Sequence, residues 1–135
     1  MSLIERDWVM RMVKQIVDFI ARALKLAKEG KDKEAIELLE SGCLEVLGIP
    51  WSALALVDSK SAAGVLGDGA RVAAFGRILE ERATIEAMQG KVALAAQRRE
   101  HALEIYQEAL ARSPKNAEAL AGVARLNGST QTPAE

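Results

Sequence analysis

From residue 4 to residue 27, apolar side chains recur at the three- and four-residue spacing of an α-helix, and no glycine or proline interrupts the pattern before Gly30. At about 100° per residue, the apolar arc runs from Trp8 and Leu26 round to Val17 and covers roughly 180°, which is wider than the stripe of roughly 100° on a surface helix. The pattern therefore predicts a long helix with more apolar surface than one neighbouring helix covers.

Helix breakers and caps divide the first half of the chain. Gly30 ends the first predicted helix and Asp32 is a candidate cap for the next, so residues 4–48 are expected to form an antiparallel hairpin. Residues 51–69 predict an irregular helical connection. It begins with a short helix over residues 51–57 and continues, where three glycines cluster, as one or two broken turns.

The second half of the chain has a similar arrangement. Asp68 is a candidate cap for a hairpin over residues 69–112, and a capping helix is expected over residues 116–126. Residues 127–135 lose both the periodicity and the large apolar side chains, so a disordered tail is expected there. Since no alternating run typical of a strand occurs, residues 1–126 are predicted to form one all-α domain, a compact bundle of antiparallel helical hairpins.

Composition and charge exclude several classes of function. The 135 residues carry 18 basic and 19 acidic side chains, and the net charge of −1 provides no basic surface for a nucleic acid. The longest uncharged stretch, residues 46–57, is too short to span a membrane, and the charged residues among residues 1–11 do not fit a secretory signal. We therefore expect a cytoplasmic protein that binds neither nucleic acid nor membrane.

The chain contains one histidine and one cysteine, which exclude a disulfide framework and leave too few ligands for a zinc site. His101 is either part of a metal or acid–base site or a solvated surface residue, and its position away from the apolar stripe of its helix favours the second. Cys43, on an apolar face, is expected to be a buried small residue. No catalytic residue, metal or cofactor is therefore expected, and the chain is predicted not to be an enzyme.

A pattern of small and large residues recurs in the two predicted hairpins. In the first hairpin the pattern comprises Phe19, Ala23, Leu26, Ala35, Leu39 and Gly42. In the last part of the chain it comprises Ala102, Tyr106, Ala109, Leu110 and Pro114, as in the second half of a repeat, followed by Leu120, Val123 and Ala124, as in the first helix of another. This spacing resembles that of the tetratricopeptide family, and the resemblance implies stacked helical hairpins in which small residues allow close packing. Residues 4–11 are in addition similar to the start of small bacterial helical proteins of unknown function.

The wide apolar arc of the first helix is the strongest candidate for a functional surface. Either other helices of the monomer bury it, or part of it stays exposed for a second copy or a partner helix. The second alternative is favoured, and it assigns the interaction to Trp8, Val9, Met10, Met12 and Val13. The leading prediction is therefore a non-enzymatic protein–protein interaction module that forms a homodimer or binds another protein.

Arg99 supports an alternative function. Its position falls inside the apolar stripe of the predicted helix over residues 91–112. Such an arginine extends to the rim, pairs with an internal carboxylate, or binds the carboxylate of a peptide or small ligand. In the last case, Arg99 and Tyr106 would be the polar contacts of a ligand pocket between the irregular connection over residues 51–69 and the last hairpin.

Overall fold

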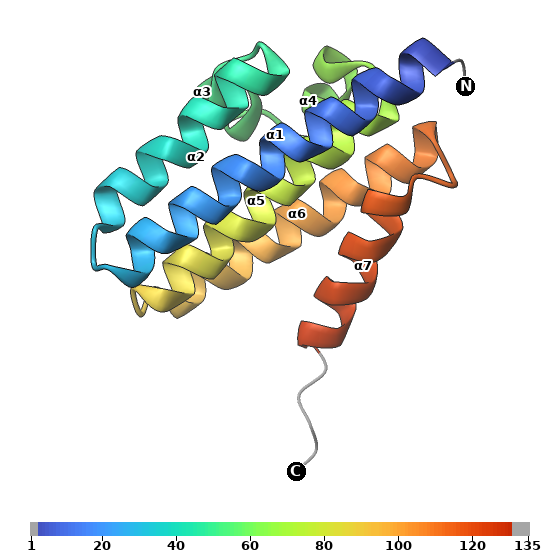
Figure 1. Ribbon diagram of the computed structural model, residues 1–135. Coiled ribbons are helices and arrows are strands. Elements are labelled where there is room, and N and C mark those ends of the chain that lie inside the picture. Colours follow the sequence, from blue (N-terminus) through green and yellow to red (C-terminus); the bar gives the residue numbers. More distant parts are fainter. Residues whose placement is uncertain (1–2, 131–135) are drawn as a thin grey trace.

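The computed structural model describes residues 3–130, and every regular element in this part of the chain is an α-helix (Figure 1). The seven helices of the described residues are α1 (Leu3–Lys28), α2 (Asp32–Leu47), α3 (Trp51–Ala55), α4 (Ser59–Leu66), α5 (Gly69–Met88), α6 (Val92–Arg112) and α7 (Ala117–Thr130). The all-α prediction is confirmed, and the predicted hairpins over residues 4–48 and 69–112 correspond to α1–α2 and α5–α6.

Helix α5 is the central element of the fold, and it contacts α1, α2, α4, α6 and α7 (Figure 1). More than half of its 20 residues are buried, and they lie on several sides of the helix, as expected for a helix that neighbours cover all round. Its large buried apolar side chains are Val72, Phe75, Ile78, Leu79 and Ile85. Helix α5 therefore passes through the hydrophobic core, and the other long helices pack around it.

The turns of the two long hairpins have the same backbone structure. Gly30 ends the first helix of one hairpin with φ 80°, and Gly90 ends the first helix of the other with φ 81°. In both turns, the N–H of the residue after the glycine donates a 2.9 Å hydrogen bond to the carbonyl five residues earlier. Glycine adopts this left-handed conformation without steric cost. The two turns therefore match residue for residue, with an offset of 60 positions.

Small buried residues recur at matching positions of the two hairpins. The pairs related by 60 positions are Ala23 and Ala83, Ala35 and Ala95, and Gly42 and Ala102. Because a small side chain lets two helices approach closely, both hairpins can pack tightly at these positions.

The two predicted aspartate caps have different outcomes. Asp68 caps α5, because its side-chain oxygen accepts a 2.9 Å hydrogen bond from the N–H of Arg71. The prediction that Asp32 caps α2 is wrong. Asp32 is the first helical residue, and the cap position belongs to Lys31, whose side chain makes no capping hydrogen bond. A carboxylate in the first turn still interacts favourably with the helix dipole.

The segment between the hairpins is more regular than its glycines predict. Helix α3 ends at Ala55, two residues before the predicted end, and residues 59–66 form the continuous helix α4 rather than broken turns. Asp58 caps this helix, since its carboxylate accepts a 2.8 Å hydrogen bond from the N–H of Ser61.

At the other end of the chain, α7 continues to Thr130, so the predicted disorder is wrong for residues 127–130. The rest of that predicted tail lies outside the described residues.

Candidate functional site

The predicted interaction surface at the start of α1 has a buried part and two exposed edges. Met12 is 3% exposed and belongs to the core, so its assignment to an exposed surface is wrong. Met10 is 60% exposed and Trp8 is 40% exposed, whereas Val9 and Val13 are half-buried. The middle of the apolar arc faces α2 and α5, and only its edges reach solvent.

The two exposed edges lie on different sides of α1. Trp8 and Val9 line a hollow of about 630 Å³, together with residues 67–70 at the start of α5 and residues at the α6–α7 junction. Met10 belongs to the opposite edge, the outer stripe of α1, which comprises Leu3, Met10, Val13 and Val17. Leu3 is 77% exposed and Val17 is 44% exposed. A shallow hollow of about 470 Å³ continues this stripe between Lys14 and Ala21.

Tyr106 is fully buried, so the prediction that it contacts a ligand directly is wrong. Its hydroxyl donates a 2.7 Å hydrogen bond to Glu80. The same carboxylate accepts hydrogen bonds from Arg125 at 2.8 and 3.0 Å. Tyr106 therefore links α6 to α5, and through Glu80 to α7, behind the surface at which a ligand could arrive.

Two glycines make room for the Tyr106 ring. A Cβ atom at Gly76 would lie 2.8 Å from the Tyr106 ring, and a Cβ atom at Gly122 would overlap the ring from the other helix. Real carbon atoms do not approach this closely, so both positions require glycine while the tyrosine is present. The ring is thus held between the backbones of α5 and α7.

Arg99 lies at the edge of the apolar interior, as predicted, but the predicted pocket between residues 51–69 and the last hairpin is wrong, because no residue of that segment lines the hollow at Arg99. Arg99 is half-buried and lines a hollow of about 440 Å³ between α5, α6 and α7. The other residues around this hollow, the α7-side hollow, are Glu80, Thr84, Ala87, Met88 and Leu126. Of the two predicted contacts, Arg99 alone lines the open space, since Tyr106 is fully buried.

A charge cluster that the sequence predictions do not include connects α2, α5 and α6, with Glu86 buried at its centre and its three partners partly exposed. Glu86 is 2% exposed and receives a bidentate pair of hydrogen bonds from Arg98, at 3.1 and 2.8 Å. Arg82 lies with its Nε 3.5 Å from the same carboxylate and donates a 2.7 Å hydrogen bond to Glu40. Two carboxylates and two guanidinium groups therefore balance their charges. Glu86 follows Leu79 by seven residues and Phe75 by eleven, and this shared helix face is the signal that could have identified it.

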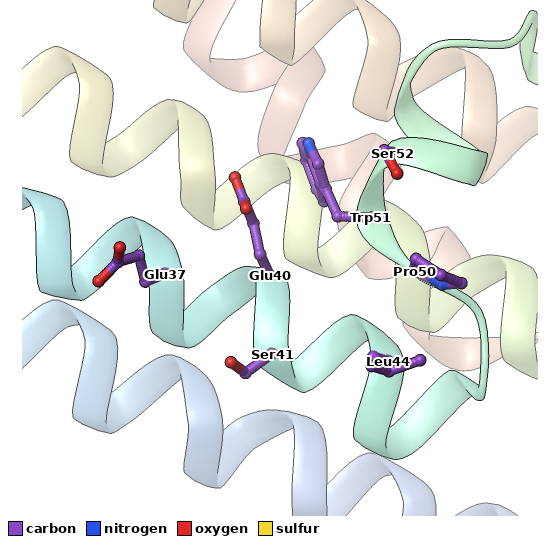
Figure 2. Close-up of a pocket in the computed structure, with 7 residues that line it drawn as sticks. All are labelled: Glu37, Glu40, Ser41, Leu44, Pro50, Trp51 and Ser52. Atoms are coloured by element: carbon purple, nitrogen blue, oxygen red, sulfur yellow. The ribbon is translucent and has the colours of Figure 1, made fainter.

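The indole ring of Trp51 covers this charge cluster. The guanidinium carbons of Arg82 and Arg98 lie 4.6 and 5.7 Å from its ring centroid, and its edge meets Phe75 at a centroid distance of 5.9 Å. Figure 2 shows Trp51 beside Glu40, at a hollow of about 410 Å³ between α2 and the start of α3. Stacked guanidinium groups and a T-shaped aromatic contact each stabilise such an arrangement. Through Trp51, the short helix α3 therefore packs against α5 and α6. The charges of the cluster compensate one another.

His101 is half-buried, and Cys43 is fully buried. The half-buried His101 ring lies edge-on to Phe75, with a centroid distance of 6.2 Å, so the prediction of a solvated histidine is wrong. Burial lowers the pKa of His101, the Arg98 charge lowers it further, and Glu104 opposes both effects. Cys43 is fully buried, as predicted, and burial raises the pKa of its thiol to about 12. The cysteine is therefore a packed thiol at neutral pH, since the thiolate is the reactive form.

The lowered pKa of His101 predicts a pH-dependent stability. Unfolded histidine titrates near pKa 6.5, so below this pH the unfolded chain binds a proton that the folded chain binds less readily. The stabilisation is complete above about pH 6.5 and is lost as the pH falls through that value toward the lower folded-state pKa. Denaturant unfolding at about pH 8 and about pH 5.5 should show a smaller loss for His101→Gln than for the wild type. Equal losses in the two proteins would contradict the assignment.

Within the described residues, no group of three or more histidine, cysteine, aspartate or glutamate side chains is arranged to hold a metal ion. No helix in that part of the chain has the length and apolar content that crossing a membrane requires. Comparisons with protein-family models, with curated proteins and with solved structures find no match to this chain.

Proposed function

We propose that this protein is a non-enzymatic interaction module that self-associates through the outer stripe of α1. The supporting observation is the exposure of large apolar side chains along one side of this helix, with Leu3 at 77%, Met10 at 60% and Val17 at 44%. These three residues are each seven positions apart, which is the repeat that two packed helices share along a common seam. Exposed apolar stripes of this kind are typical of protein–protein interfaces.

The charges beside the stripe favour a second copy of the chain in antiparallel orientation. Asp7, Lys14, Asp18 and Lys25 are exposed and alternate in sign along the same edge of α1. In an antiparallel pair centred near Ile16, Asp7 lies opposite the partner's Lys25, and Lys14 lies opposite the partner's Asp18. A twofold axis repeats each of these ion pairs, so the helix is complementary to itself. Such rim charges contribute mainly to orientation and specificity, while the apolar stripe supplies the affinity.

The test is the molecular mass in solution, measured by sedimentation over a series of protein concentrations. We expect a dimer for the wild type and a folded monomer for Val17→Glu, because a carboxylate in the centre of the seam would be desolvated without a partner. Val65→Glu is the matched control: Val65 is 58% exposed on α4, and this variant should remain dimeric. A wild type that is monomeric throughout, or a Val17→Glu variant that remains dimeric, would contradict the proposal.

Charge exchange tests the orientation. Lys14→Asp should weaken the dimer, because it places two aspartates opposite each other, and the further change Asp18→Lys should restore it. Asp18 also contacts Arg22 of its own helix at 3.4 Å, so circular dichroism of each variant must show that α1 remains helical. A double variant that stays as weak as Lys14→Asp would exclude the antiparallel register.

A further inference from the structure

The two hairpins carry different side chains at positions related by the offset of 60. Leu39 corresponds to Arg99, and Ile20 corresponds to Glu80. Leu39 and Ile20 are 1% and 3% exposed and belong to the hydrophobic core. Arg99 and Glu80, by contrast, line the α7-side hollow. The second hairpin therefore has charged groups at positions where the first hairpin has packed aliphatic side chains.

The same exchange extends to two more residues of the hollow. Leu24, which packs against the core, corresponds to Thr84 in its lining, and buried Ala27 corresponds to exposed Ala87. In the first hairpin these four positions are packed, whereas in the second they line about 440 Å³ of open space; Met88 is the exception, since it corresponds to the exposed Lys28. A space of this size is in the range of small-ligand sites, which span roughly 300–1,000 Å³.

The charges around the hollow are unequally compensated. Glu80 is satisfied, since it accepts hydrogen bonds from Arg125 and from the Tyr106 hydroxyl. Arg99 is half-buried, and its guanidinium makes no hydrogen bond or ion pair with any group that the structure describes. A guanidinium has five donors in a planar fork that matches a carboxylate. The Arg99 guanidinium is therefore an uncompensated positive charge beside a hollow whose lining includes the exposed Met88 and the buried Leu126.

We propose that the α7-side hollow binds a small organic carboxylate with a short aliphatic chain. Arg99 binds the carboxylate group through paired N–H···O hydrogen bonds, which are among the strongest that a protein makes. The aliphatic chain packs on Met88 and Leu126, and Thr84 contributes a polar edge. This site is independent of the outer stripe of α1, because its residues belong to α5, α6 and α7.

The test uses hexanoate as the probe and amide chemical shifts of the full chain as the measurement. Hexanoate should cause saturable shifts around residues 84–88, 99 and 126, whereas hexanamide, which has the same chain without the charge, should bind at least about tenfold more weakly. Binding of hexanamide as strong as that of hexanoate, or shifts confined to other helices, would overturn the proposal. So would binding of an acetylated tripeptide without binding of hexanoate, which would assign the site to a peptide terminus.

Two substitutions separate binding from a structural role of Arg99. Arg99→Leu introduces the residue of the first hairpin and should abolish the hexanoate shifts while the melting temperature stays equal or rises, because the guanidinium has no partner to lose. Arg11→Gln removes an exposed arginine of α1 and should leave hexanoate binding unchanged. An Arg99→Leu variant that still binds hexanoate would overturn the proposal, and so would one that loses stability as a broken ion pair does.

Discussion

Glu86→Gln is expected to lower the free energy of unfolding by about 3 kcal/mol, which is at the low end of the roughly 3–5 kcal/mol lost when one partner of a buried ion pair is removed. The substitution leaves two guanidinium groups, Arg82 and Arg98, without the carboxylate between them. The low end applies because these side chains are 16% and 18% exposed, so water screens part of their charge. Urea unfolding at neutral pH and fixed protein concentration measures the loss.

A control variant shows whether the loss of stability comes from the buried position of Glu86 or from the removal of a glutamate charge at any position. Glu45 is exposed on α2, and Glu45→Gln should change the free energy of unfolding by no more than about 0.5 kcal/mol. If both variants lose equally little, the Glu86 carboxylate is solvated and the buried cluster does not exist in solution.

The corresponding residues of the first hairpin suggest a second substitution that should restore part of the stability lost when Glu86 is replaced. Leu26 and Leu38 occupy the positions of the first hairpin that correspond to Glu86 and Arg98. Glu86→Leu combined with Arg98→Leu should therefore be less destabilising than either single change, since a buried ion pair can often be replaced by packed aliphatic side chains. A double-mutant cycle measures this coupling directly, and additive losses would contradict it.

Gly122→Ala is expected to lower the free energy of unfolding by about 3 kcal/mol, at the upper end of the range for overpacking. The added methyl group would overlap the Tyr106 ring, which cannot move aside because the α5 backbone at Gly76 lies against its opposite side. The hydroxyl is in addition held by Glu80. Unfolding in urea, followed by far-ultraviolet circular dichroism, measures the effect.

Gly128→Ala, in the same helix, is the control for this prediction. A Cβ atom at Gly128 meets nothing within 4 Å, so this change should be neutral or stabilising by up to about 1 kcal/mol, because alanine favours the helix. Combining Gly122→Ala with Tyr106→Leu should recover part of the loss, since leucine leaves room for the methyl group. A Gly122→Ala variant as stable as Gly128→Ala would show that Tyr106 is not confined.

Local sequence signals identified elements whose boundaries depend on local chemistry. The spacing of apolar residues predicted the long helices, and Asp68 was correctly identified as a cap. The prediction of broken turns for residues 59–66 is wrong. The cap from Asp58 outweighs the weak helix preference of the glycine in that segment, so the residues form a helix. Glycine frequency alone thus underestimates a short helix that has a good cap and a packed face.

The candidate sites depend on contacts between residues that are far apart in the chain. The apolar arc of α1 predicted surplus surface, but the packing of α2 and α5 decided that Met12 is core and that Met10 and Val17 face solvent. Similarly, the position of Arg99 in its helix predicted an arginine near the interior. Only the packing of α7 showed that open space remains beside it.

By itself, the sequence determined an all-α chain with two long hairpins, because helix periodicity and turn chemistry act over a few residues. The tertiary structure decided which polar groups meet. Glu86 and Arg98 are joined across α5 and α6, and Tyr106 reaches Glu80 through space left by two glycines. These contacts depend on how three helices approach one another, and a helical pattern specifies which side of a helix is apolar, but not which neighbour covers it.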